Sequence, residues 1–273
     1  MRVLTFGALM QDGELELQPG FVTDGEPSQE KGELVVEAVA RSGQTLAVTA
    51  LPLGAPCGYP GGETGRATVG LVAFPERASG LRVSLNGTVL LERTAPPGEL
   101  EVKVEWPASL SSVETIRWRA SADDRVASLG YSNDGGKTWT PVALPGPADT
   151  IEVDARVLPG GRDSFLELIA TDGFHTERVR SDAYEVEPKG WVLWILLPPA
   201  GIRLPAGEPV HLAAQGYHLE ERRGGFDNIE WESSVGGGGL GSGAHVLATL
   251  EPGEQTIRAR MHDVTAEVPV SVE

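Results

Sequence analysis

Hydrophobic and polar residues alternate along most of this chain with a period of two. Successive side chains of an extended strand point to opposite faces of a sheet, so this alternation predicts strands with one buried face. Clear examples lie at 33–39, 45–49, 81–85, 88–92 and 99–105. No stretch of about 11 residues carries an apolar stripe at helical spacing. We therefore expect an all-β protein.

Turn residues separate the alternating runs. Asn86-Gly87 lies between two of them, and both residues accept the positive φ of a type I′ turn, which predicts a hairpin. Gln11-Asp12-Gly13 predicts a second turn between strands.

Two shifts in composition predict the domain boundaries. Trp106-Pro107-Ala108 follows one expected strand and precedes the next, and 187–190 does the same before a tryptophan-rich run. The pieces at 107–188 and 189–273 have about the size of an immunoglobulin-like sandwich. We therefore expect three consecutive β-sandwich modules, at 1–106, 107–188 and 189–273.

The charge of the chain limits its partners. The 273 residues include 39 Asp and Glu against 22 Lys and Arg, a net charge of −17. Binding to phosphate groups depends on Lys and Arg, so we expect neither nucleic acid nor an anionic membrane as partner.

Neither end of the chain nor its cysteine fixes a compartment. The longest apolar run, 191–197, has seven residues, whereas a membrane-spanning helix needs about 20. The N-terminal apolar stretch is too short for a signal peptide, so the chain is either cytosolic or lacks an upstream segment that carries one. Cys57 is the single cysteine, which excludes an intramolecular disulfide, and we expect a thiol without a role in an irregular loop at 52–68.

One short motif predicts a tight hairpin. Residues 132–139 match the pattern Ser-x-Asp-x-Gly-x-Thr-Trp, the Asp-box of propeller blades. Asp134 can accept hydrogen bonds from turn amides, and Trp139 can pack beneath the turn. A sialidase-like propeller would need several copies, and this chain has one, so we expect Asp134 to be a turn residue and no catalyst.

Three parts of the chain resemble known modules. Residues 116–186 resemble a fibronectin type III-like or Ig-like module, on the stretches 116–124, 129–139 and 170–174. Residues 195–272 resemble the bacterial Ig-like or PKD-like module, on the stretches 199–201, 229–234, 239–243 and 250–257. The first unit looks like the β-sandwich that often precedes them. The resemblance implies accessory modules from the C-terminal region of a secreted bacterial protein, with any catalytic domain upstream.

The same resemblance suggests weak calcium ligands. Modules of this kind often carry an acidic loop, and here that loop keeps two carboxylates, Asp123 and Asp124, with Arg125 beside them. The corresponding loop of the third unit, 219–225, is also depleted. Calcium prefers six to eight oxygen ligands. We therefore expect no cofactor, with calcium at Asp123 and Asp124 as the alternative.

The histidines and serines do not form a recognisable catalytic or zinc motif. None of the five histidines has the spacing of a zinc motif, and we expect His211 and His218 to be separate surface residues. No Gly-x-Ser-x-Gly elbow occurs. A triad assembled from distant residues stays open.

The tryptophans could serve either a core or a ligand. Trp118 and Trp231 lie in alternating runs, where a sandwich core is expected. Trp191 and Trp194 are three apart and should face opposite sides of one strand. Exposed aromatic rings stack on sugars, so the candidate ligand residues are Trp139, Trp191 and Trp194.

These observations favour a non-catalytic accessory array. We expect a spacer, structural support or adhesion platform from a larger secreted or cell-surface bacterial protein, located outside the cell. Its partners would be other domains of the same polypeptide, or an extracellular protein or glycan. A carbohydrate-binding module is the alternative, followed by a hydrolase whose site lies between modules.

Overall fold

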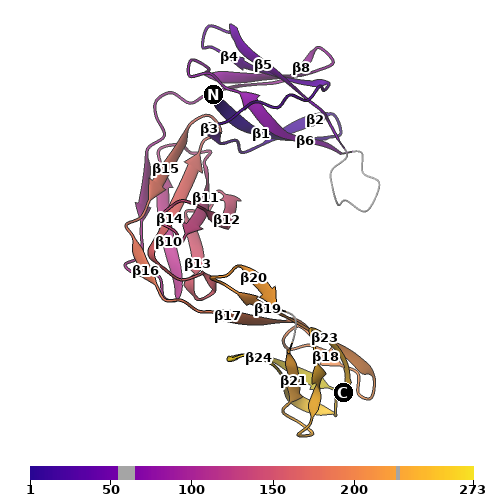
Figure 1. Cartoon of the computed structure of the whole chain (residues 1–273). Coiled ribbons are helices and arrows are strands. Elements are labelled where there is room, and N and C mark those ends of the chain that lie inside the picture. Colours follow the sequence, from indigo (N-terminus) through magenta and orange to yellow (C-terminus); the bar gives the residue numbers. More distant parts are fainter. Residues whose placement is uncertain (55–64, 226–227) are drawn as a thin grey trace. The chain divides into compact units, whose positions relative to one another are not determined.

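The chain is an all-β protein of three consecutive β-sandwiches. The computed structural model describes residues 1–54, 65–225 and 228–273 (Figure 1). Within this part, the helical structure is one 3₁₀ turn at Ala155–Val157. No helix of the described residues is long and apolar enough to cross a bilayer. Cys57, with most of its loop, lies outside the described residues.

The first sandwich pairs two four-stranded sheets. One contains β1 (Arg2–Gln11), β2 (Glu14–Gln18), β3 (Val22–Asp24) and β6 (Arg66–Ala73). The other has the order β5 (Thr45–Leu51), β4 (Leu34–Val39), β7 (Gly80–Leu85) and β8 (Thr88–Thr94). Alternate residues of both sheets meet in one buried cluster, for example Phe6 from β1 and Val36 from β4. The period-two pattern thus builds the core directly.

The second sandwich combines a three-stranded and a five-stranded sheet. The first has the order β13 (Thr150–Asp154), β10 (Val113–Ala120), β9 (Val102–Glu105). The second has the order β12 (Thr140–Gly146), β11 (Val126–Ser132), β14 (Gly161–Thr171), β15 (Thr176–Arg180), with β16 (Tyr184–Val186) also paired to β14. Trp118 and Tyr131, each 1% exposed, are among its largest buried side chains. β9 is paired with β10 and so belongs to this sandwich.

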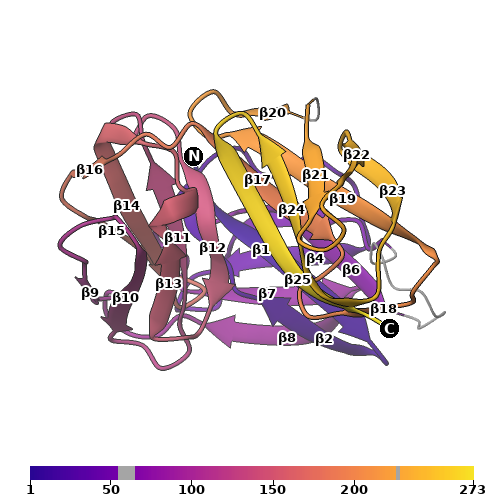
Figure 2. The same cartoon turned by 90° about the horizontal axis from the view of Figure 1, so that it is seen from below.

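The third sandwich pairs a four-stranded and a five-stranded sheet (Figure 2). In the first, β19 (Pro209–His218) is paired with β17 (Trp191–Leu197), β20 (Arg223–Gly225) and β23 (His245–Thr249). The second has the order β18 (Arg203–Leu204), β25 (Val264–Val272), β24 (Gly253–Met261), β21 (Glu230–Ser233), β22 (Gly239–Ser242). Leu212 and Trp231, from opposite sheets, share its core.

The chain divides into two compact units. The first consists of Met1–Ala108, Glu114–Val153 and Phe165–Ala183. The second consists of Ser109–Val113, Asp154–Ser164 and Tyr184–Glu273. The first unit therefore holds the first sandwich together with most of the second. The module boundaries expected from the sequence stay predictions.

Both turn predictions are confirmed. Asn86 and Gly87 have φ values of 51° and 83°, the left-handed conformation of a type I′ turn between β7 and β8. Asp12 and Gly13, at 52° and 84°, do the same between β1 and β2.

We predict that Gly87→Ala lowers the free energy of unfolding by about 1 kcal/mol, because a Cβ is unfavourable at this left-handed φ. Space is not the cause, since nothing lies within 4 Å of the added Cβ. The matched control is Gly238→Ala, where space is equally open and φ is outside the left-handed region. Denaturant titration should show a change within about 0.5 kcal/mol for this control. Equal losses in the two variants would contradict the explanation.

Candidate functional site

The turn between β14 and β15 is held by a buried carboxylate. Asp172 is 5% exposed, and its Oδ1 accepts hydrogen bonds from the backbone N–H groups of Phe174 (2.8 Å) and His175 (2.7 Å). Its Oδ2 lies 2.8 Å from His175 Nδ1. Gly173 provides the positive φ of 93° that the turn requires. A buried carboxylate thus fixes the whole turn.

This turn places Phe174 in the core of the first sandwich. Phe174 is 2% exposed and belongs to the same buried cluster as Leu4, Phe6 and Leu81. Its ring centroid lies 6.2 Å from that of Phe74. The guanidinium carbon of Arg93 lies 5.8 Å from the Phe174 ring centroid, as a cation–π contact. A residue from the second sandwich therefore completes the core of the first.

Two threonines attach the same hairpin to the start of β3 and the residues just before it. The Thr171 hydroxyl donates to the carbonyl oxygen of Gly20 at 2.7 Å. The Thr176 hydroxyl oxygen accepts the Val22 N–H, also at 2.7 Å. Apolar and polar contacts therefore hold this hairpin against the first sandwich within one unit.

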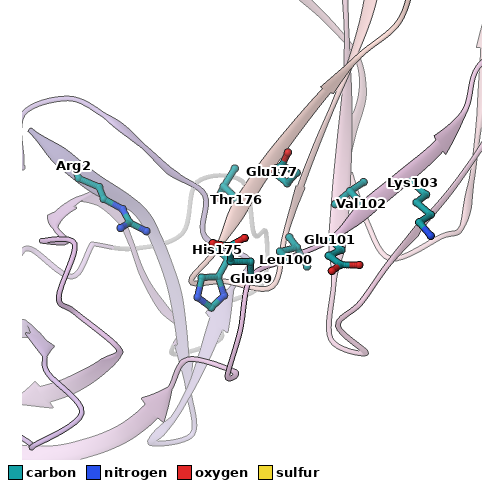
Figure 3. A pocket seen from close by; sticks show the side chains of 9 residues that line it. All are labelled: Arg2, Glu99, Leu100, Glu101, Val102, Lys103, His175, Thr176 and Glu177. Carbon is teal, nitrogen blue, oxygen red and sulfur yellow. The ribbon is translucent and has the colours of Figure 1, made fainter.

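A cleft of about 620 Å³ lies beside this hairpin (Figure 3). Its lining consists of Arg2, Glu99, Leu100, Glu101, Val102, Lys103, His175, Thr176 and Glu177. The lining is mainly charged, with both signs present.

The hydroxyl and imidazole groups that line the cleft are already engaged in the fold. The hydroxyl of the lining is that of Thr176, which already accepts the Val22 N–H. His175 is bound to Asp172 through Nδ1. A hydroxyl nucleophile needs a base within reach, and within this described lining no hydrogen bond joins the Thr176 hydroxyl to the His175 ring.

The loop with the alternative calcium ligands Asp123 and Asp124 contains an arginine that bonds within and beside it. Asp123 and Asp124 are exposed, and Arg125 donates to the Asp123 carbonyl oxygen at 3.2 Å and to the Asp149 carboxylate. Among the described residues, no group of three or more His, Cys, Asp or Glu side chains surrounds a common point where a metal ion could bind. Calcium at Asp123 and Asp124 stays a prediction.

Two tryptophans lie in cores, and two of the ligand candidates contact other side chains. Trp118 and Trp231 are each 1% exposed, which confirms their place in the cores. Of the three ligand candidates, Trp139 lies 4.9 Å beneath the Arg180 guanidinium. Trp191 stacks on His262 at 4.8 Å and contacts Arg223 at 5.0 Å.

Trp194 is the exposed one of the three candidates. Its side chain is 39% exposed on β17, whereas Trp191 on the same strand packs against the core of the third sandwich. This confirms that the two residues face opposite ways. The candidates do not form a row of free rings.

The Asp-box folds as the tight hairpin that its sequence predicts. Asp134 Oδ1 accepts the N–H groups of Lys137 (3.0 Å) and Thr138 (2.9 Å), and Oδ2 accepts the Thr138 hydroxyl at 2.7 Å. Ser132 donates to Asp134 at 2.8 Å. The N–H and hydroxyl of Thr138, with the Ser132 hydroxyl, hold the pKa of Asp134 well below its usual range. Asp134 stabilises a turn, as expected.

Sequence reasoning missed a second structural carboxylate, which is partly buried and lies in the second unit. Glu220 Oε1 accepts the N–H groups of Gly160 (2.8 Å) and Lys189 (3.0 Å), and Oε2 accepts that of Gly190 (2.9 Å). Burial raises the pKa of Glu220, but these N–H donors outweigh burial and lower it below the usual value. No local motif marks this residue, because its partners are 30 to 60 positions away.

Comparison with known proteins yields no family. No protein-family model and no curated protein matches the chain. Fibronectin(III)-like modules of Clostridium thermocellum CbhA are similar at 15% identity and TM-score 0.26, covering 63% of this chain and 94% of that one. Domains 4 and 5 of the S-layer protein SbsC show 12% identity, TM-score 0.23 and coverages of 64% and 99%. Similarity at this level supports no conclusion about function. The fold is assigned from the strand pairing of this chain.

We predict that Phe174→Ala lowers the free energy of unfolding by about 3–5 kcal/mol, because it empties a site in a packed core. The first two sandwiches should then unfold in separate thermal transitions, whereas we expect one transition for this unit in the unchanged protein. Calorimetry measures both effects. Phe174→Leu, which keeps most of the apolar volume, is the control and should retain the single transition. A single transition in Phe174→Ala would contradict a shared core.

We predict that Glu220→Gln lowers stability by about 1–3 kcal/mol at neutral pH, because the amide cannot accept all three N–H groups as a carboxylate does. A depressed native pKa adds stability above the unfolded pKa of about 4.3, and this stability disappears as the pH falls through the lower native value. The difference between parent and variant should therefore shrink on acidification.

The adjacent exposed Glu221, which pairs with Arg223, provides the control for this variant. Glu221→Gln should change stability by less than about 1 kcal/mol. Chemical denaturation across the acidic pH range separates the two variants. A constant difference between Glu220→Gln and the parent would contradict the assigned interaction.

Proposed function

We propose that this chain is a non-catalytic array of β-sandwich modules that serves as a stiff spacer or structural support in a larger secreted or cell-surface bacterial protein. Its partners are then other domains of the same polypeptide or neighbouring extracellular molecules. The resemblance of the sequence to accessory modules of secreted bacterial proteins supports this proposal.

The observation that carries the proposal is the shared core in the first unit. A flexible linker between sandwiches leaves each core complete by itself, whereas here Phe174 of one sandwich fills the core of another. The Thr171 and Thr176 hydrogen bonds add directional contacts at the same place. A support or spacer needs such resistance to bending.

The second unit has a comparable device. Glu220 holds the two residues directly before β17, through the N–H groups of Lys189 and Gly190. Gly190 in this segment has a positive φ of 67°, a conformation that glycine adopts readily. The carboxylate thus fixes the backbone where the chain enters β17.

Carbohydrate binding receives less support. It needs aromatic faces that are free to stack on sugars, and those of Trp139 and Trp191 are covered by other side chains. Trp194 alone provides too little contact area for a sugar chain. An enzyme between modules is also less supported, since the lining of the cleft does not join a nucleophile to a base.

We predict a narrow distance distribution within the first unit. Spin labels at Val48→Cys and Leu144→Cys, which are 59% and 82% exposed, report the two sandwiches in a Cys57→Ser background. Pulsed dipolar spectroscopy should give one narrow peak, and Phe174→Ala should broaden it while Phe174→Leu does not. A broad distribution in the parent would overturn the stiff-spacer proposal.

The wider context has its own test. Antibodies against this chain should detect a natural polypeptide well above 28.9 kDa in the extracellular or surface fraction of its source cells. A species of 28.9 kDa confined to the cytoplasm would overturn that part of the proposal and leave the stiffness measurement unaffected.

A further inference from the structure

Two exposed histidines on neighbouring strands of the third sandwich face each other. His211 lies on β19 and His245 on β23, and His211 Nε2 is 3.1 Å from His245 Nδ1. The ring centroids are 5.3 Å apart and the planes are inclined by 29°. The pair is 34 residues apart in sequence, so no spacing motif shows it.

The register of the sheet places both rings on one outer face. His211 is paired with Leu247 and His245 with Ala213, so the two histidines are diagonal neighbours across antiparallel strands. Val210 and Leu212, which flank His211, point into the core. Alternation along the strand therefore turns His211 outward, and both rings are open to solvent.

The separation of the two nitrogens fits a chelated metal ion. Metal–imidazole bonds of about 2.0–2.1 Å at angles of 90–109° place two nitrogens about 2.9–3.3 Å apart. The observed 3.1 Å lies inside this range. Without a metal, one facing nitrogen carries the proton of the hydrogen bond. When both imidazoles are neutral, that proton can move to the other nitrogen of the same ring. The two facing nitrogens then each offer a lone pair to the ion, and no proton is released.

We propose that His211 and His245 form a bidentate site for a divalent transition metal, with copper(II) bound most tightly and nickel(II) and zinc(II) more weakly. Imidazole suits these ions, and their order follows the general series of affinities. Among the described residues no third His, Cys, Asp or Glu joins the pair, so water completes the coordination. The net charge of −17 attracts cations to the protein.

The test uses the full chain without a polyhistidine tag and copper(II) alone as the probe. Calorimetric titration at neutral pH should show one dominant site per chain. His211→Asn and His245→Asn should each weaken binding at least about tenfold, and the double variant should differ little from either, because a chelate is lost with its first ligand. Electron paramagnetic resonance should detect two imidazole nitrogens in the parent and fewer in each variant.

His262→Asn is the matched control, because His262 is also exposed but stacks on Trp191. It should bind copper(II) as the parent does. Both pair residues are at the surface, so thermal unfolding should show variants as stable as the parent in the absence of metal. Equal and small losses in all three single variants, or a tight site that survives in the double variant, would overturn the proposal.

Discussion

The burial of Phe174 in the core of the first sandwich is the contact on which the first unit depends. The ring sits at the tip of a hairpin whose strands belong to the second sandwich, yet its neighbours are Leu4, Phe6 and Phe74. If the hairpin were detached, the first core would lose one of its buried side chains, and the Phe174 ring would face water. The apolar driving force that folds the first sandwich therefore also attaches the second.

Buried or partly buried carboxylates add directional hydrogen bonds to these apolar contacts. Asp172 fixes the turn that presents Phe174, Asp134 closes the Asp-box hairpin, and Glu220 holds the chain near Lys189 and Gly190. In each case a carboxylate satisfies backbone N–H groups that a loop leaves without strand partners. These three acidic residues therefore have a structural role. Their carboxylate chemistry alone would not distinguish that role from a catalytic one.

Features set by neighbouring residues could be predicted from the sequence. The alternating runs, the Asn86-Gly87 turn, the Asp-box hairpin and the two core tryptophans all follow from local periodicity or turn chemistry. The contacts that join distant segments could not. Phe174 lies 100 positions from Phe74, and nothing in the motif around it distinguishes a ring buried in its own sandwich from one buried in another.

The same limit applies to the polar sites. Glu220 belongs to a loop interpreted as a depleted calcium loop, and its three N–H donors become visible only when the chain is folded. The nearest histidine to His211 in the sequence is His218, seven residues away, whereas the register of β19 and β23 brings His211 to His245. Strand pairing is a long-range property, so residues that a sheet brings together need not be close in sequence.

The distribution of these contacts separates the functional alternatives. An active site requires polar groups that converge on a space where substrate can bind, and a glycan site requires free aromatic faces. In the described part of this chain, the best-organised polar and aromatic groups instead bind backbone amides, fill cores or cover one another. They lie where one segment must be held against another, as Phe174, Asp172 and Glu220 do. Interactions concentrated at such junctions are what the proposed support would need.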